Sequence, residues 1–468
     1  MRLRHTIFPC ALLLVFAAPL AATQEFQPRA VTPEEFGIDL PAGEVLPGAG
    51  RRVNTVDEAG EGCVALVYVR VGDAAIVMLP DGRLVPRSAA QCTATERPFK
   101  AIDMDTLGAQ LIAEEFEGFK TKQTRRYLYI YNTSEEYALA TSRILETMYP
   151  GIKGYMDQQD IETRDPEVPL VVLMFRTEEE FQKYRRMPAG VLAYYHTLDN
   201  RVAMYEQSAL AEIKPELAIQ QAISTIAHEG VHQILANIGV QRRLSVWPMW
   251  LSEGLAEYFA PTSTGQRLRW KGPGQVNDLR MFELENYIKS RDTETPEGQF
   301  VEHTVLAGRL TSTGYAAAWA LTHHLAKNER TKFHAYLRDV SKLQPLESCG
   351  EMVSPGIVRE NLVLFQQHFG DDLTALERRV GDHLVKQPYT HPFAEFPHIV
   401  AMISAVIDGR PMRAANVFHS PELAAQWQSQ TVGKVPEANR ASARATLMVF
   451  DNRAQATEYM ARWLAGRE

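Results

Sequence analysis

The stretch from about Pro215 to Ile238 places polar side chains inside an apolar helix. Its apolar residues recur at helical spacing, which is typical of a helix buried in a core, at Ile219, Ile223, Ile226, Ile234, Leu235 and Ile238. The same stretch reads His228-Glu229-Gly-Val-His232. Two imidazoles four residues apart share one helix face, and burying them is costly unless they have partners. The chain must therefore fold so that this helix is both buried and supplied with polar or metal partners.

The pair His228 and His232 predicts a zinc site. Neutral imidazole is a good zinc ligand, and a catalytic zinc keeps three protein ligands and one water, so a third ligand must come from elsewhere in the chain. Zinc makes its water acidic enough to ionise near neutral pH. Glu229 stands next to a ligand without being one, so it is placed to accept the water proton as a general base. The alternative is a pair of satisfied core histidines.

A second helix is predicted between Pro248 and Pro261, because proline suits a first helical turn and also ends a helical run. It carries Glu253 and Glu257 four residues apart on one side. Glu253 is the candidate third ligand. Metal-bound histidines usually donate their second N–H to a carboxylate or carbonyl, so Glu257 is the candidate partner of a liganding histidine. The alternative for both glutamates is a solvated surface acid.

Two stretches taken together match a known pattern, namely His228-Glu-Gly-Val-His232-Gln233 with Asn237, and Trp250-Leu-Ser-Glu253-Gly-Leu-Ala256. They resemble the gluzincin zinc metallopeptidases of the peptidase MA clan, especially the aminopeptidase N branch. The resemblance covers about the middle third of the chain. It implies that His228, His232 and Glu253 bind zinc, that Glu229 is the general base, and that a mixed-sheet upper lobe meets a helical lower lobe at the metal. The spacing between His232 and Glu253 is slightly longer than in the aminopeptidases, so a longer loop is expected from Gly239 to Trp247.

One strand departs from that branch. Its aminopeptidases carry a Gly-Ala-Met-Glu-Asn strand whose glutamate holds the free amine of the substrate, whereas this chain reads Arg201-Val-Ala-Met204-Tyr205-Glu206. Because side chains of a strand alternate between faces, the one-residue shift is expected to aim Glu206 away from the site. The choice between endopeptidase and exopeptidase therefore stays open. The strand is either an edge on which an extended peptide could pair or an ordinary buried strand.

The resemblance also implies a tyrosine that stabilises the oxyanion of the tetrahedral intermediate. Tyr315, at the start of a predicted helix, is the candidate, since a phenol aimed at developing charge stabilises it. The Lys and Gly that follow the family's tyrosine are absent here, and a plain packing role is the alternative. His323 and His324 in the same helix are fallbacks, although such histidines are most often solvated or placed at the negative helix end.

The N-terminus predicts export. Arg2 and Arg4 precede an apolar stretch from Ile7 to Ala22 that is broken by prolines and ends in small residues, which is typical of a secretory signal peptide. No later segment offers the roughly eighteen uninterrupted apolar residues of a membrane span. We therefore expect a periplasmic or secreted protein without stable membrane insertion after signal cleavage. A retained membrane anchor is the alternative.

Export also permits disulfides. Cys63 and Cys92 flank a short strand-rich segment, and a bridge between them is predicted, which leaves Cys349 unpaired. No C-x-x-C pair is present, so metal binding by cysteines is not expected.

Size and charge bound the class of protein. With 468 residues and 45% apolar content, the chain can bury a large core in two or three domains. A net charge of -8 argues against nucleic acid or an anionic membrane as the main partner. The predicted divisions are a signal peptide (1–22), a β-rich module with an extended leader (23–100), the metallopeptidase-like domain (101–388) and an α+β accessory module (389–468). The predicted fold class is α+β.

Periodicity and turn residues place the individual elements. Strands are expected at 64–71, 74–79, 83–86, 126–131, 169–175, 201–205, 398–407, 412–418 and 444–450. Helices are expected at 105–119, 134–156, 178–186, 215–238, 279–290, 315–327, 331–340, 357–369, 373–385, 421–430 and 453–464. The Pro- and Gly-rich stretch from Thr23 to Arg52 is expected to be extended or partly disordered. The C-terminal module lacks clustered His, Cys or acid pairs, which predicts a role in localisation or partner binding.

These patterns predict an exported zinc metallopeptidase that acts on peptide or protein substrates, with Glu229 activating the water. Two alternatives stay open, because a fold does not by itself determine activity. One is a zinc-containing envelope binding protein with little or no turnover. The other is a zinc hydrolase of a non-peptide bond. The oligomeric state and the subsite preference leave no mark in the sequence.

Overall fold

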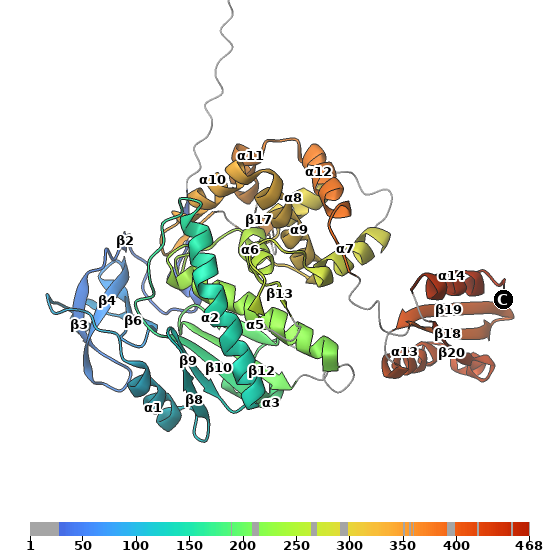
Figure 1. Cartoon of the computed structure of the whole chain (residues 1–468), viewed down its shortest axis with the longest axis horizontal. Coiled ribbons are helices and arrows are strands. Elements are labelled where there is room, and N and C mark those ends of the chain that lie inside the picture. The colour runs from blue at the N-terminus through green and yellow to red at the C-terminus, as the bar shows by residue number, and fades with distance from the viewer. Residues whose placement is uncertain are drawn as a thin grey trace, which may run out of the picture.

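The computed structural model of the chain describes residues 28–188, 190–207, 215–263, 269–290, 298–349, 352–354, 357–358, 360–390, 398–418, 421–450 and 453–467. The predicted signal peptide lies outside these residues. The described part combines helices with several separate sheets, which confirms an α+β fold (Figure 1). None of the described helices combines the length and the apolar character needed to cross a membrane.

A five-stranded sheet supports the helix that carries the histidine pair. Its strand order is β11 (Ala193–His196), β12 (Arg201–Gln207), β10 (Leu170–Thr177), β9 (Tyr127–Tyr131) and β8 (Lys120–Gln123). The three inner strands run parallel, and the two edge strands run antiparallel to their neighbours. The inner strands are the three that the sequence predicts in this region, whereas both edge strands are additional.

Helices cover both faces of this sheet, as the alternation along β9 illustrates. Tyr127, Tyr129 and Tyr131 pack in one core with α2 (Glu135–Asp157) and α5 (Pro215–Asn237). Leu128 and Ile130 pack on the other face with α1 (Met104–Glu114) and α3 (Glu178–Tyr184). Strands buried on both faces need apolar residues at nearly every position, as in these sequences. The sheet thus holds α5 against one of its faces.

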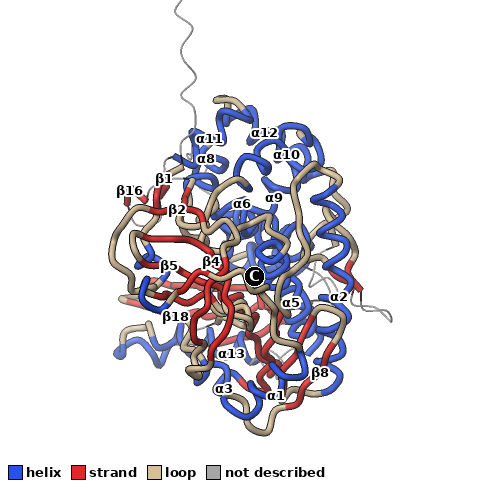
Figure 2. The backbone as a smooth tube through the Cα atoms, turned by 90° about the vertical axis from the view of Figure 1, so that its left-hand side faces the viewer, coloured by secondary structure: helices blue, strands red, loops and turns tan. Residues whose placement is uncertain are grey.

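Between Met249 and Val385 the described residues are mostly helical and form the helical region. It lies on one side of the sheet region, which is the five-stranded sheet with its covering helices (Figures 1 and 2). The helices are α6 (Met249–Phe259), α7 (Asp278–Ser290), α8 (Gln299–Leu306), α9 (Ser312–Asn328), α10 (Arg330–Ser341), α11 (Glu360–Phe369) and α12 (Leu373–Val385). Short strand pairs accompany them, β13 (Thr262–Ser263) with β14 (Arg269–Trp270) and β16 (Met352–Ser354) with β17 (Ile357–Val358). Since α6 packs against both α5 and α9, it joins the helical region to the sheet region.

The N-terminal region forms a β-rich module. Its sheet has the order β6 (Leu84–Arg87), β5 (Ala74–Met78), β4 (Gly62–Val71), β3 (Arg52–Val56) and β7 (Thr93–Ala94), with β2 (Val45–Pro47) also paired to β4. The predicted strands at 64–71, 74–79 and 83–86 are confirmed. One face shares a buried cluster with Val168, Leu244 and Leu346, so the module packs against the region that carries the histidine helix.

Residues 28–52, expected to be extended or partly disordered, contain little regular structure, in keeping with the first alternative, but they are anchored to other parts of the chain. This segment contains β1 (Arg29–Ala30), which pairs with β15 (Glu347–Ser348), and the 3₁₀ helix η1 (Pro33–Phe36). Val31 and Ile38 are buried. A segment with few apolar residues shows little periodicity, yet those few can dock on surfaces that distant parts of the chain provide.

The predicted disulfide is also wrong, because Cys63 and Cys92 are free. Strand β3 lies between them, since Thr55 pairs with Cys63 on one side and β7 begins directly after Cys92 on the other side. Two strand spacings place the cysteines roughly 10 Å apart, beyond the roughly 7 Å that a disulfide tolerates between Cα atoms. The third described cysteine, Cys349, is free and buried.

The C-terminal module has the predicted element order. Strand β18 (His398–Ile407) lies between β19 (Arg410–Phe418) and β20 (Arg444–Phe450), and it packs with α13 (Pro421–Gly433) and α14 (Arg453–Leu464). A 3₁₀ helix, η3 (Glu437–Ser442), precedes β20. The hairpin turn is Asp408-Gly409, with φ of 52° and 77°, because a two-residue turn of this type needs left-handed backbone at both positions.

Candidate metal centre

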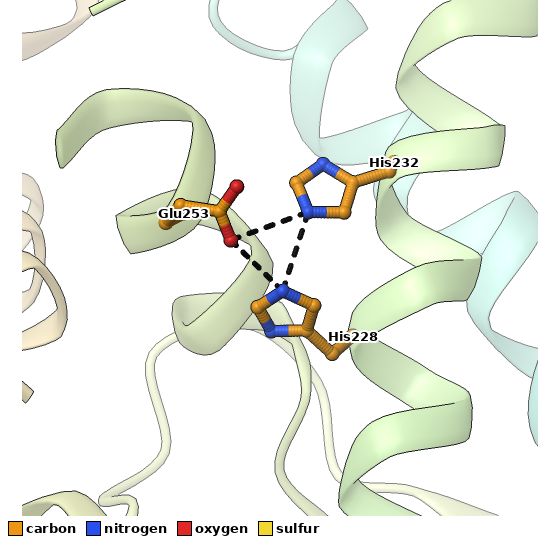
Figure 3. Close-up of side chains that lie close together, drawn as sticks. All are labelled: His228, His232 and Glu253. Atoms are coloured by element: carbon orange, nitrogen blue, oxygen red, sulfur yellow. Dashed lines mark hydrogen bonds and ion pairs between the residues drawn. The ribbon is translucent and has the colours of Figure 1, made fainter. Parts of the chain in front are cut away.

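Three side chains from two neighbouring helices converge between the sheet region and the helical region (Figure 3). Helix α5 presents His228 and His232 on one face, and α6 presents Glu253 toward them. Gly230 lies between the two histidines, where a Cβ would clash with Leu145 of α2. The glycine lets α5 pack closely on α2, and the opposite face of α5, with both imidazoles, stays turned toward α6.

The spacing of the three ligand atoms suits one tetrahedral metal ion. Nε2 of His228 lies 3.0 Å from Oε2 of Glu253 and 3.2 Å from Nε2 of His232. The distance from Nε2 of His232 to Oε2 of Glu253 is 3.5 Å. Zinc ligands at roughly 2.0–2.2 Å in tetrahedral geometry lie roughly 3.3–3.6 Å from one another, so the three atoms lie within about 0.3 Å of the spacing around a bound ion. Among the described residues this is the one group of three or more His, Cys, Asp and Glu with such spacing, and the donor set of two imidazoles and a carboxylate fits zinc.

The predicted contact between Glu257 and a histidine of the pair is present. Oε1 of Glu257 lies 3.0 Å from Nδ1 of His228, which leaves Nε2 of that imidazole facing Glu253. Glu257 is almost fully buried, and two residues near the start of α7 also bind its carboxylate. Arg280 contributes an ion pair of 2.6 Å, and the Asn277 side-chain amide donates a hydrogen bond of 2.9 Å. A buried carboxylate is stable with this set of partners.

Burial and charge act in opposite directions on these groups. Burial raises the pKa of Glu257, but the Arg280 charge and the His228 hydrogen bond outweigh it and hold that pKa at about 2. Burial lowers the pKa of His228, but hydrogen bonds to Glu253 and Glu257 raise it well above its ordinary value. The centre is therefore rich in negative charge that a cation stabilises.

Glu229 also lies at this centre, but its carboxylate is bound by the sheet and not by the three candidate ligands. Its carboxylate accepts a hydrogen bond of 2.8 Å from the backbone N–H of Tyr195 on β11. It lines the same cavity as His228, His232 and Glu253. The acid that the sequence predicts as general base is thus beside the ligand triad and outside it, held by an edge strand.

The strand predicted as a possible edge is an inner strand. Strand β12 pairs with both β10 and β11, so β11 is the edge of the sheet on this side. Glu206, which stands one residue later than the glutamate of the aminopeptidase strand, contacts the start of α2. Its carboxylate accepts hydrogen bonds from the backbone N–H, at 2.8 Å, and the hydroxyl of Ser134, which caps α2.

Tyr315 lies near the first turn of α9 and reaches the centre. Its ring centroid is 5.9 Å from that of His228, and the Arg280 guanidinium lies 5.4 Å from the ring. Burial and then the charges of Glu253, Glu229 and Glu257 raise its pKa above the ordinary value for tyrosine. The phenol therefore stays protonated and can donate a hydrogen bond.

The two fallback histidines are elsewhere and are not solvated. His323 and His324 are 1% and 3% exposed. His323 shares a hydrogen bond of 2.8 Å with His383 of α12 and lies 3.2 Å from the Gly274 carbonyl oxygen. Burial lowers the pKa of both residues to about 4. Of the two positions that are usual for such histidines, solvent and the negative helix end, the solvated one is excluded because α12 covers this face of α9.

The centre opens into a cavity of about 380 Å³. Edge strand β11 forms one wall with Ala193, Tyr194 and Tyr195, and the connection between α5 and α6 forms another with residues 241–245. Phe36 of η1 adds a contribution from the N-terminal segment. The sequence does not predict these wall residues. Only the two adjacent tyrosines of β11 form a recognisable local pattern, and that pattern is typical of a strand and says nothing about a cavity.

Comparison with protein families gives a match over part of the chain. Residues 222–347 are similar to the family described as "Protein of unknown function (DUF1570)", and no curated protein matches the chain. The matched range begins inside α5 and ends at β15, so it includes the triad, Glu229, Glu257 and Tyr315. The site therefore lies within the part of the chain that this family covers.

Proposed function

We propose that this protein is a zinc-dependent peptidase of the gluzincin type. The observation that carries the proposal is the convergence of His228, His232 and Glu253 at zinc-ligand spacing, with Glu229 beside them but bound to β11. The placement of the centre, between a mixed sheet and a helical region, also supports it. An exported location for this activity rests on the N-terminal sequence pattern.

Each side chain has a defined role in this reaction. Bound zinc would supply Lewis-acid polarisation of the amide carbonyl and an acidified water. Glu229 accepts the proton of the attacking water and then delivers it to the leaving amine. The Tyr315 hydroxyl donates a hydrogen bond to the oxyanion of the tetrahedral intermediate. Glu257 fixes the tautomer and the ring orientation of His228.

Strand β11 positions the substrate in this proposal. It is the edge of the five-stranded sheet and it lines the cavity. An extended peptide can add to an edge strand through backbone hydrogen bonds. Because the Tyr195 N–H already holds Glu229, a peptide paired with this strand lies next to the general base. An extended peptide backbone therefore fits this site as a substrate better than a compact small molecule does.

The test combines zinc content with cleavage. Purified parent protein is expected to contain one zinc per chain and to cleave members of a mixed peptide library. Glu229→Gln should keep the zinc and lower cleavage by at least about 100-fold, the usual contribution of a general base. Glu136→Gln, at an exposed position on α2, is the matched control and should behave like the parent.

Two results would reject the proposal. Protein that contains no zinc and takes none up on dialysis has no metal centre. Protein that holds one zinc per chain and cleaves no peptide is not a peptidase.

A further inference from the structure

Two consecutive arginines line the wall of the catalytic cavity, and the proposed reaction uses neither. Arg242 and Arg243 belong to the connection between α5 and α6. The cavity wall otherwise contains two acids, Glu229 and Glu253, among the residues that the structure describes. Arginine side chains at a substrate cavity either support the backbone or bind anionic groups.

Arg243 supports the backbone. It is 5% exposed, and its guanidinium donates to three carbonyl oxygens, those of Thr197, Leu198 and Gly82, at 2.6, 2.7 and 2.8 Å. These bonds tie the connection to the loop after β11 and to the N-terminal module. The geometry of Arg243 is therefore determined by the fold, and few of its donors are left for a ligand.

Arg242 is different. It is half-buried and lines the cavity, yet its guanidinium makes no hydrogen bond or ion pair with any residue in the described ranges. Ser245 bonds only its backbone carbonyl. An arginine has five N–H donors in a planar fork that matches a carboxylate in two-point geometry. Arg242 thus lines the cavity with its fork unpaired among the described residues.

The charge of the cavity favours an anion. With a divalent cation on the triad, the carboxylates of Glu229 and Glu253 balance the ion, and the two guanidinium groups then leave an excess of positive charge. A cavity lined by one sign of charge attracts ligands of the opposite sign.

We propose that Arg242 binds a carboxylate of the substrate, so that this site selects peptides with an acidic group close to the cleaved bond. This inference rests on the proposed peptidase function. The carboxylate has two possible sources with the same chemistry, the side chain of an aspartate or glutamate and the free C-terminus of the peptide. Arg242 is then a specificity-determining residue.

The experiment uses one peptide sequence in four forms. An internal glutamate is compared with glutamine, and a free C-terminal acid is compared with the C-terminal amide. Cleavage is measured as kcat/KM for the zinc-loaded parent. Binding is measured as Kd for zinc-loaded Glu229→Gln, which retains the cavity. At least one acidic form is expected to exceed its neutral counterpart about tenfold in both measurements, as a charge-assisted two-point contact predicts.

Substitution of Arg242 connects this preference to the residue. Arg242→Gln should bring the ratio of acidic to neutral peptide close to one, and Arg242→Lys should retain part of it, because lysine keeps the charge but lacks the fork. Arg176→Gln, at an exposed position of β10 outside the cavity wall, is the control and should keep the ratio of the parent. Circular dichroism and zinc content verify that each variant is folded.

The outcomes separate this inference from the proposed function. Equal kcat/KM on all four peptides overturns the role of Arg242. A preference for the acidic peptide that is unchanged in Arg242→Gln also overturns it. Both results leave the peptidase proposal in place. Binding that depends on a carboxylate and on Arg242 without any cleavage supports the anion site and rejects the peptidase. If the glutamate peptide exceeds the glutamine peptide, the carboxylate is a side chain. If the C-terminal acid exceeds the C-terminal amide, it is the C-terminus of the peptide. Absence of both binding and cleavage rejects both.

Discussion

Replacing Gly254 by alanine tests how closely two helices must pack to form the metal centre. Gly254 follows Glu253 on α6 and faces α9. A Cβ at this position would clash with the Thr322 hydroxyl and would lie 2.7 Å from the carbonyl oxygen of Ala318. The threonine side chain can rotate away, but the carbonyl belongs to the backbone of α9. We therefore expect α6 and α9 to move apart in Gly254→Ala.

The size of the effect follows from this contact. A distance of 2.7 Å is about 0.7 Å short of the 3.4 Å of an ordinary contact. Overpacking of this kind destabilises by about 1–3 kcal/mol, and alanine returns about 1 kcal/mol through its higher helix propensity. The free energy of unfolding should fall by up to about 2 kcal/mol. Metal–ligand distances stay within about 0.2 Å of their usual values, and disturbing the support of a ligand typically lowers affinity about 10- to 100-fold. We expect an effect of this size on zinc affinity from the displacement of Glu253.

The assay measures stability and metal binding separately. Urea unfolding of the zinc-free protein reports stability, and titration against a competing chelator reports zinc affinity. Gly381→Ala is the matched control, because it changes an exposed helical glycine of α12 with nothing within 4 Å of the added Cβ. It should gain about 0.5–1 kcal/mol from propensity and bind zinc like the parent. If Gly254→Ala gains stability as Gly381→Ala does and binds zinc equally well, the close approach of α6 and α9 is not what positions Glu253.

Three further predictions concern the surroundings of the centre. Glu257→Gln removes the carboxylate charge that faces Nδ1 of His228 and should lower zinc affinity about 10- to 100-fold in the chelator titration. Equal affinity would show that this carboxylate does not tune the ligand. Tyr315→Phe should lower kcat about 100- to 1,000-fold with full zinc content, and an unchanged kcat would leave Tyr315 a packing role. In the folded protein, burial lowers the pKa of His323 from its ordinary 6.5 to about 4. The unfolded state therefore binds the proton first as pH falls, and the free energy of unfolding decreases between pH 6.5 and pH 4. Urea unfolding should show a loss of about 2 kcal/mol from pH 7 to pH 5 on this account, smaller in His323→Gln; the same loss in both proteins would contradict it.

Local patterns were sufficient for most of the helices and for the ligand spacing, although α8 was not predicted and residues 357–358, predicted as the start of a helix, form β17. Helix α12 and strands β18 and β20 begin and end where periodicity and turn residues predicted. The same holds for the placement of His228 and His232 on one helix face, because a spacing of four residues determines that face in any helix. Glu253 could be predicted as a partner only because its residue type and the helix around it suit a zinc ligand.

The correct and the wrong predictions differ in the range of the contacts involved. The Cys63–Cys92 bridge was predicted from two positions in the sequence, but the insertion of β3 between their strands depends on pairing across the sheet. For His323, a solvated position was one of the two expected, and α12, which lies far along the chain, covers it. In both cases the contact that decides the outcome joins segments that are apart in the sequence, and no periodic pattern predicts such a contact.

Taken alone, the sequence determined which residues can bind a metal and on which helices they stand, because helix geometry and ligand chemistry are local properties. Only the tertiary structure decided what surrounds them. It set edge strand β11 against Glu229 and Arg280 of α7 against Glu257. Each of these contacts joins different elements and forms only when the sheet, α5, α6 and α7 pack together, since burial and charge pairing depend on the whole set of neighbours.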